Sequence, residues 1–365
     1  MVRAERESSR WGAFCQQQFA VSKISRVIGK LACFLAVTVL LLAAALYGVM
    51  YVLAKGPSPT ARNLFVMSVR ETSAMGFLAN LFFTEDEIAQ IMGNQTEEIA
   101  ETDTSLITIQ REKPENPDRI PDAWGLVDED GDGIILEPVK GETYSGYMMV
   151  VLDPSRVIMG SVPKSFNARG YTVAQMAEQF DAVAGINAGG FDDPDGNGNG
   201  SVPDSLVVFE GRIYFPNRGV RSGFVGLDAD GVLHTGKLTK AEIEEQNIRY
   251  GVCFGPSLIV NGEVVLSDTG GGGLNPRTAI GQRSDGAILL LVIDGRQVIS
   301  IGATLWDLVD VFQKYGAVNA CNLDGGSSSM MWYNGDYVNN CASVIGIRPV
   351  PTTFLVMKEG WNAGA

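Results

Sequence analysis

The feature that most constrains this chain is an uncharged apolar stretch near its N-terminus. Residues Leu31 to Ala54 form 24 consecutive positions without a charged side chain. About 20 apolar residues in a helix are enough to cross the hydrocarbon core of a bilayer. The alternative is a signal peptide, whose apolar stretch is shorter and is followed closely by a cleavage site of small residues. The length of this stretch, with no convincing cleavage motif behind it, favours an uncleaved membrane anchor.

The charges on either side of the stretch predict its orientation. Six basic and two acidic side chains precede it, and the basic side of a membrane span stays in the cytoplasm. We therefore expect a single-pass cell-membrane protein with a cytoplasmic N-terminus and an extracellular C-terminal domain. The whole chain carries a net charge of −14, so the part after Ala54 carries −18. The negative electrostatic potential of this part disfavours nucleic acid, which is also negatively charged, as a partner.

Composition changes along the chain predict five parts. We expect a cytoplasmic tail (1–30), a transmembrane anchor (31–54), a juxtamembrane helical stalk with an acidic linker (55–133), a main domain (134–358) and a short tail (359–365). In the stalk, Thr84 and Glu87 have the spacing of a capping box that opens a helix.

Short strands and tight turns dominate the main domain. Turn dipeptides at Glu210–Gly211, Asp230–Gly231 and Asn261–Gly262 predict three hairpins, which are antiparallel by construction. A different unit follows, in which an apolar strand over 287–293, a helix opened by Thr304 and a strand over 318–323 form a strand-helix-strand crossover. Such a crossover makes its two strands parallel. The sequence thus predicts an α+β fold with a mixed, largely antiparallel sheet and flanking helices, preceded by one transmembrane helix.

Four polar segments bracketed by glycine stand out against the apolar strands. They are residues 187–193, 255–257, 275–281 together with 294–296, and 322–329. Each alone is typical of a turn, but four strand ends that present Asn, Arg or Asp indicate one cleft. Arg277 and Arg296 suit a phosphate or carboxylate. Asp294 and Asp324, which the crossover brings to one sheet edge, suit an acid and a base or a nucleophile.

In their order and spacing, these segments resemble the motifs of the phosphodiester glycosidase family over roughly Gly141 to Met357. The resemblance implies hydrolysis of a sugar 1-phosphodiester at the glycosidic side, with a glycan or sugar-phosphate substrate. It makes Asp324 and Asp294 the leading catalytic or metal-coordinating carboxylates. The substrate-binding residues that it implies are Asn187, Gly189, Gly190, Arg277, Thr278, Arg296, Gly325, Gly326 and Ser327. Ala188, Asp192 and Ser327 depart from the family pattern, which leaves the sugar open.

Two acidic loops are candidates for calcium, although the sequence requires no cofactor. The first follows the Asn187 segment and offers Asp192, Asp193, Asp195 and Asn197, all oxygen ligands that a hard cation prefers. An acidic flap without metal is the alternative there. The second, at 128–133, matches the first half of a calcium loop but has Val139 where a bidentate Glu belongs, which favours a solvated turn before a strand.

Cysteine and histidine contribute little to the predicted chemistry. Cys253, Cys321 and Cys341 allow at most one bridge, Cys321 to Cys341 being one option and buried thiols the other. His234 is the one histidine of the chain, and its place in a hairpin strand favours packing over catalysis.

The sequence leaves three functions to compare. The leading one is a membrane-anchored, cell-surface phosphodiester glycosidase acting on envelope polymer or exopolysaccharide. A non-catalytic glycan-binding or exopolysaccharide-assembly protein would keep the cleft without turnover. A stalked structural protein would leave Arg277 and Arg296 far apart in solvent.

Overall fold

The computed structural model describes residues 2–72, 75–92, 101–109, 119–166, 169–192, 200–214, 222–266, 272–343 and 346–361. The chain divides into two compact units, Met1–Arg62 and Asn63–Ala365. The first is dominated by one helix, α1 (Val2–Lys55). Its part Ile28–Lys55 is long and apolar enough to cross a membrane by length and composition, a test that a signal sequence also passes. The five-part division predicted from composition stays a prediction.

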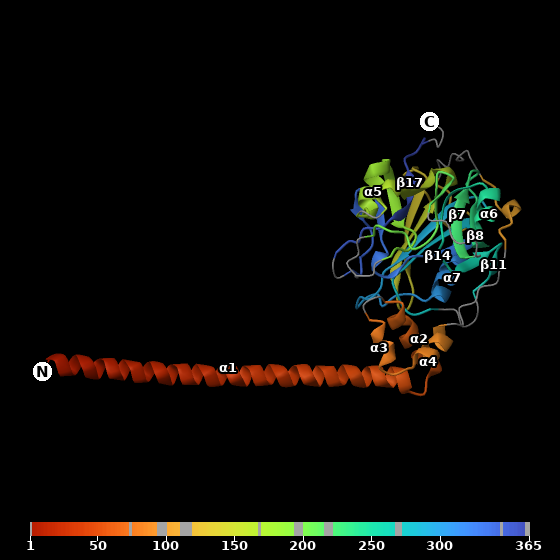
Figure 1. Ribbon diagram of the computed structural model, residues 1–365. Helices are drawn as coiled ribbons and strands as arrows, with labels where there is room; N and C mark the ends of the chain where they lie inside the picture. The colour runs from red at the N-terminus through yellow and green to blue at the C-terminus, as the bar shows by residue number, and fades with distance from the viewer. Residues whose placement is uncertain are drawn as a thin grey trace. The chain divides into compact units, whose positions relative to one another are not determined.

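The second unit contains the remaining elements, shown in Figure 1. Its helices, counting α2, which begins just before the boundary, are α2 (Pro59–Arg70), α3 (Phe77–Asn80), α4 (Glu85–Met92), α5 (Val173–Phe180), α6 (Lys240–Glu245) and α7 (Leu305–Lys314). Its 3-10 turns are η1 (Thr104–Leu106), η2 (Pro154–Arg156), η3 (Pro163–Ser165) and η4 (Gly326–Ser328). Side-chain capping boxes begin α4, α5, α6 and α7, and those of α4 and α7 confirm the helix starts predicted at Thr84 and Thr304.

The strands form three sheets where one was expected. The seven-stranded sheet has the order β1 (Ile134–Lys140), β2 (Ser145–Val151), β13 (Ile288–Ile293), β12 (Arg277–Arg283), β14 (Ala317–Leu323), β10 (Ser257–Val260), β11 (Glu263–Val264). The second sheet has the order β16 (Asp336–Tyr337), β15 (Met331–Tyr333), β4 (Ala182–Asn187), β17 (Thr352–Met357), β3 (Val157–Ser161). The third has the order β6 (Arg212–Tyr214), β5 (Val207–Phe209), β9 (Ile248–Val252), β7 (Ser222–Asp228), β8 (Leu233–Leu238).

The pairings confirm an α+β fold with antiparallel sheets. The three predicted hairpins are β5–β6, β7–β8 and β10–β11. The crossover is also present: α7 connects β13 to β14, and the two strands run parallel to each other. They are not neighbours, because β12 lies between them and is antiparallel to both.

The core explains how one strand can be buried on both faces. Along β13, Ile288, Leu290 and Val292 pack into a central core that all three sheets share, whereas the intervening Leu289 and Leu291 pack toward α7. This alternation follows from the two-residue period of a strand. Helix α5 packs against β3, β4 and β17, and α7 packs against β10 and β14. In Figure 1, α5 and α6 lie on opposite sides of the sheets. The loops at the ends of the strands are therefore left to carry chemistry.

Candidate functional site

The candidate site lies where β12 begins and β13 and β14 end. Arg277, the first residue of β12, pairs with Ile293, the last residue of β13. Thr278 pairs with Leu323, the last residue of β14. Asp294 and Asp324 therefore follow strands that end at the same edge, as the crossover predicted.

Asn187 ties this edge to the second sheet. Its side chain is fully buried. Its Nδ2 donates to the carbonyl oxygen of Asp324 at 2.6 Å, and its Oδ1 accepts from Thr278 Oγ1 at 2.8 Å and from the Met330 amide at 3.1 Å. These bonds differ from the expected substrate contacts of Asn187 and Thr278, since both side chains are used to hold protein groups. The structure favours a positioning role for the pair.

Asp324 is the carboxyl group best placed for acid–base chemistry. Its backbone amide donates to the Ala188 carbonyl oxygen at 2.9 Å, which fixes the turn beside the Asn187 loop. Burial raises the pKa of Asp324 to about 7, against the opposing effects of the Ser328 hydroxyl, Arg348 and the Gly325 amide. The charge of Asp204 adds to the increase. A carboxyl group with a pKa near neutrality can both accept and donate a proton.

Asp294 has a different environment. It is buried, and its Oδ1 accepts from Asn339 Nδ2 at 3.0 Å and from the Asn340 amide at 2.9 Å. Its Oδ2 accepts from Asn340 Nδ2 at 3.3 Å. Both oxygens thus hold the turn at 339–340. The catalytic role predicted for Asp294 stays untested, and these contacts favour a positioning role instead.

Two charged residues near Asp324 were missed by the sequence analysis. Arg348 Nη1 donates to Ser327 Oγ at 2.8 Å, and its guanidinium carbon lies 5.1 Å from the centre of the Phe191 ring. Asp204 lies against Gly190, where an added Cβ would collide with its carboxylate. The pKa of Asp204 is raised, mainly by desolvation and further by Asp192. No motif surrounds either residue, so only their contacts reveal them.

Arg277 and Arg296, which the sequence predicted to share one cleft, are linked through Asn275 and Glu71. Arg296 Nη2 donates to Asn275 Oδ1 at 3.0 Å and to Thr72 Oγ1 at 3.0 Å. Arg277 Nη2 donates to Glu71 Oε2 at 2.9 Å, and Asn275 Nδ2 donates to the same oxygen at 2.7 Å. The pKa of Arg296 is lowered, first by burial and then by the positive charge of Arg277, while Glu71 opposes the change. Arg277 is buried and Arg296 is exposed, but the two lie close together, which differs from the separated arginines expected of a structural protein.

Glycines bring the Asp324 turn close to these arginines. Gly326 has φ +63°, and its amide donates to the Pro276 carbonyl oxygen at 2.8 Å. An added Cβ there would lie 3.3 Å from Arg296 Nη2. Gly325 has a similar constraint, because its Cβ would lie 2.8 Å from the same Pro276 oxygen. Only residues without a side chain allow this close approach.

The other predicted site residues fall into two groups. Gly189 donates its amide to Thr352 Oγ1 at 3.0 Å, next to the Asn187 loop. Asp193, Asp195 and Asn197 lie outside the described residues, so the calcium loop that they form with Asp192 stays a prediction. Elsewhere, carboxylate oxygens of Asp128, Asp130 and Asp132 lie within 4.8 Å of one another in the turn before β1. Backbone amides of that turn donate to all three side chains.

In the described part of the chain the cysteines are free thiols, and the histidine contacts a carboxylate. Cys321 and Cys341 are not bonded to each other, and their Sγ atoms donate to the carbonyl oxygens of Asn322 at 3.4 Å and Ser327 at 3.6 Å. His234 is buried, with Nε2 2.8 Å from Asp228 Oδ2 across the β7–β8 hairpin.

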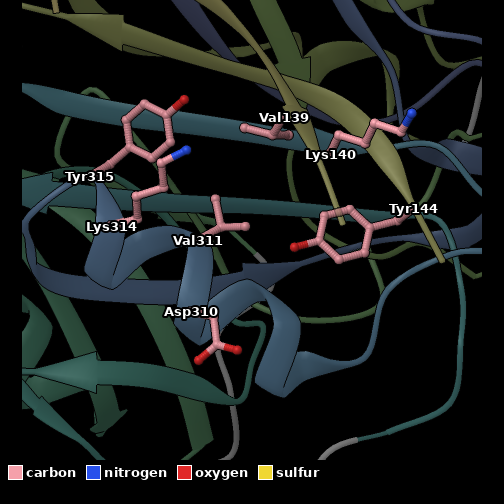
Figure 2. Close-up of a pocket in the computed structure, with 7 residues that line it drawn as sticks. All are labelled: Val139, Lys140, Tyr144, Asp310, Val311, Lys314 and Tyr315. Atoms are coloured by element: carbon pink, nitrogen blue, oxygen red, sulfur yellow. The ribbon is translucent and has the colours of Figure 1, made fainter. Parts of the chain in front are cut away.

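A hollow of about 150 Å³ lies apart from these residues. It is lined by Val139, Lys140, Tyr144, Asp310, Val311, Lys314 and Tyr315. Figure 2 shows it beside α7, with the Tyr144 ring facing that helix. Burial, followed by the charges of Asp307 and Asp310, raises the pKa of Tyr144. None of the residues predicted for the site lines this hollow.

Known proteins are similar to the part of the chain that carries this edge. Residues 180–357 match the model of the phosphodiester glycosidase family. The SPbeta prophage-derived uncharacterized protein YomE of Bacillus subtilis (strain 168) is 31% identical over 206 residues, which are 53% of this chain and 30% of that protein. The mouse N-acetylglucosamine-1-phosphodiester alpha-N-acetylglucosaminidase is 27% identical over 221 residues, which are 54% of this chain and 41% of that enzyme. The chain thus spans less than half the length of either relative.

A solved structure shows the same fold. The catalytic domain of the zebrafish N-acetylglucosamine-1-phosphodiester alpha-N-acetylglucosaminidase, auto-inhibited by its pro-peptide, superimposes with a TM-score of 0.51 at 21% identity. The superposition covers 62% of this chain and 82% of that one. Asn187, Arg277, Arg296 and Asp324 all lie within residues 180–357, which match the family model. Residues 180–357 of this domain are thus similar in sequence to the phosphodiester glycosidase family, and the domain has the fold of the zebrafish structure.

Proposed function

We propose that this protein is a glycosidase that hydrolyses a sugar 1-phosphodiester in an envelope polymer or exopolysaccharide. The observation that carries the proposal is one turn, 324–327, that joins a proton-transfer group to arginines. Asp324, with its pKa near 7, begins the turn, Gly326 lies against Arg296, and Ser327 accepts from Arg348. The mouse relative supports the reaction class, since its name describes a glycosidase acting on a phosphodiester.

In the proposed mechanism, the arginines bind the charge and Asp324 handles the proton. Arg277, Arg296 and Arg348 hold the phosphate oxygens, which matches the bidentate geometry of guanidinium groups. Asp324, as the carboxylate, accepts a proton from water as the water oxygen bonds to the anomeric carbon. The glycosidic C–O bond breaks, and its electron pair leaves with the phosphate. The products are a free sugar and a phosphomonoester.

The leaving group decides how much help the protein must give. A phosphate oxygen is a weak base, so its departure needs little protonation and depends on the stabilisation of negative charge. Preorganised cations at the phosphate are therefore expected to matter more than a second acid. This agrees with an Asp294 side chain whose oxygens already bind Asn339 and Asn340.

The location forms a second part of the proposal. Ile28–Lys55 would anchor the protein in the cell membrane, with the basic N-terminal side in the cytoplasm and the compact unit outside. A signal sequence would instead release the domain. Two separate experiments test these statements. Extraction of isolated membranes at alkaline pH tests whether the protein is anchored, and protease treatment of intact cells tests whether the compact unit lies outside. Retention in the membrane with external cleavage agrees with the anchor, and release at alkaline pH contradicts it.

The activity is tested with the full-length protein in detergent and a panel of sugar 1-phosphodiesters, with and without calcium. Asp324→Asn removes the proton-transfer group, and Asp336→Asn makes the same change at the exposed first residue of β16 as a matched control. We expect free sugar from the wild type and the control but not from Asp324→Asn. Saturable glycan binding with no sugar released from any substrate would point to a glycan-binding or assembly protein. A loss of activity on chelation would support the calcium loop at 192–197.

A further inference from the structure

A tight turn beside the candidate site carries the most exposed large apolar side chains of the described residues. Val298 is fully exposed, Ile299 is 80% exposed and Ile301 is 54% exposed, and we call these three side chains the apolar tip. The Gln297 amide donates to the Ser300 carbonyl oxygen at 2.9 Å, and the Ser300 amide donates back at 3.2 Å. Val298 and Ile299 are therefore the two corner residues of the turn. Corner positions usually hold Gly, Pro, Asn or Asp, so the turn itself gives no reason for an apolar pair.

Contacts at the base of the turn hold the apolar tip in a fixed position. The side chain of Ser300 is buried, and its Oγ donates to the Asp294 carbonyl oxygen at 2.7 Å. The same Oγ accepts from the Ser145 amide at 3.0 Å. On the other side of the turn, Gln297 Nε2 donates to the Asn340 carbonyl oxygen at 3.0 Å. The exposed side chains thus project from a braced turn.

From this arrangement we infer that the apolar tip inserts into the surface of a lipid bilayer. Aliphatic side chains gain free energy when they leave water for the boundary of the acyl chains. The Arg296 amide donates to the Ile301 carbonyl oxygen at 2.9 Å. Together with the bonds between Gln297 and Ser300, this pairs the backbone at the base of the turn, so insertion does not strip these groups of partners. Arg296 is the one charged residue of 295–302, and its guanidinium suits the lipid phosphates around an inserted tip.

The size and composition of the tip favour a bilayer over a protein partner. Each of its side chains offers roughly 100 Å² of apolar surface, and three fall far short of the about 800 Å² that each partner buries in a stable protein interface. Trp, Tyr and Arg dominate such interfaces, whereas the tip has only Val and Ile.

A second attachment in the same chain makes a small apolar tip sufficient. A tether raises the effective concentration of a weak site, so binding needs little area. Ile28–Lys55 has the length and composition for a membrane span, and the inference rests on this part of the proposed function. Asp294 and Arg296 come directly before the tip in the sequence. Insertion would therefore hold the proposed phosphate site at the membrane surface, where it would meet phosphodiesters attached to the membrane.

The test places a tryptophan in the tip of the full-length protein, reconstituted in phosphatidylcholine liposomes. The signal of Ile299→Trp is the difference between its emission spectrum and that of the wild type. We expect the added emission to be blue-shifted relative to a tryptophan in water. We also expect it to be quenched when the acyl chains are brominated about 5–10 Å below the headgroups, the depth that interfacial segments reach.

Leu106→Trp is the matched control, because Leu106 is also exposed but lies at the other end of the seven-stranded sheet. It belongs to η1, next to Asp103, whose amide donates to Asn261 Oδ1 at 2.7 Å. In the same hairpin, the Gly262 amide donates to the Val318 carbonyl oxygen near the beginning of β14, whereas the candidate site follows the end of that strand. The control emission should stay that of a tryptophan in water. Equal behaviour of the two tryptophans, both quenched or both unquenched, would overturn the inference.

A second reporter measures how much the corner residues contribute. Ile301→Trp carries the same measurement if Ile299→Trp folds poorly. Adding Val298→Ser and Ile299→Ser to this reporter should lower the ratio of inserted to free tip by about tenfold for each side chain removed. Unchanged quenching of Ile301→Trp in the presence of both serines would also overturn the inference.

Alkaline extraction and sugar release separate this inference from the proposed function. If the protein stays in the membrane and releases sugar while the tip and control tryptophans behave alike, the proposed function stands and the insertion of the tip is refuted. If the protein is released at alkaline pH, or releases no sugar, but liposomes still quench the tip tryptophan alone, the proposed function fails in that part and the insertion of the tip stands.

Discussion

Replacing Asp324 by Asn should stabilise the fold while abolishing activity. Burial raises the pKa of Asp324 from 3.8 to about 7 in the folded protein. Between these two values, the folded state holds a proton that the unfolded state releases. Folding stability from this group therefore falls as pH rises from about 4 to 7 and is constant above that. Asn resembles the neutral acid, so it carries no such cost.

The size of the effect follows from the pKa difference. A pKa difference of about three units lowers the free energy of unfolding by roughly 4 kcal/mol at pH 8. This is an upper limit, because the group retains some contact with water. At pH 5 the same calculation gives about 1.5 kcal/mol. The stability gain of Asp324→Asn should therefore shrink by up to about 3 kcal/mol between pH 8 and pH 5.

Thermal or urea unfolding of wild type and Asp324→Asn at these two pH values measures this difference. Asp336→Asn controls for the loss of a carboxylate at the surface and should show no such dependence. The kinetic counterpart is a kcat/KM that rises tenfold per pH unit up to about pH 7 and then levels, as expected for a base. A variant that is less stable than the wild type at pH 8 would refute the reasoning, because Asp324 would then be stabilising as a charge.

Three further substitutions test other parts of the site. Asn187→Ala leaves three buried partners without their bonds, so we expect a loss of about 3 kcal/mol in urea unfolding and of most sugar release; unchanged stability would contradict the positioning role. Gly326→Ala strains a residue at φ +63° and crowds Arg296, so kcat/KM should fall by about tenfold with a stability loss of about 1 kcal/mol. An unaltered kcat/KM would show that this approach is not needed. His234→Gln removes the buried contact to Asp228, so it should lower the melting temperature while kcat stays within about twofold per folded molecule; a selective loss of kcat would make the histidine catalytic.

Local signals in the sequence predicted the parts of the fold that depend on neighbouring residues. Thr84 and Thr304 each begin a helix because the capping partner lies three residues on. The Asn261–Gly262 hairpin follows because both residues take positive φ, which asparagine and glycine tolerate. The shared edge of Asp294 and Asp324 followed from the crossover rule, which does not require the strands to be adjacent.

The strand that separates β13 from β14 could not be predicted in the same way. All seven residues of β12 are buried, yet the strand includes Arg277, Gln282 and Arg283, which sequence patterns assign to the surface. Partners from other parts of the chain, together with the neighbouring Asp285, make this burial possible. Gln282 contacts the Leu233 amide and the Gly231 carbonyl oxygen, and Arg283 pairs with Asp122 and Asp285.

The same limit applies to the missed members of the site. Glu71, Asp204 and Arg348 come from three separated parts of the chain and belong to no recognisable motif. Their roles depend on tertiary contacts alone. The residues that the family motifs supplied, Arg277, Arg296 and Asp324, do lie in one connected region, although Asn187 and Asp294 have partners within the protein.

The bonds of Asn187 also bear on how the protein reaches its active form. Asn187 is separated by 91 residues from Thr278 and by 137 from Asp324, so these contacts close only when two sheets have docked. Contacts of such long range form late and slowly in folding. Hairpins such as β7–β8 pair neighbouring segments, so a refolding experiment should recover part of the β-sheet circular dichroism before it recovers catalysis. In a cell, a nascent chain with these hairpins formed would still be inactive, and enzymatic turnover would report only on molecules that have finished assembling their tertiary structure.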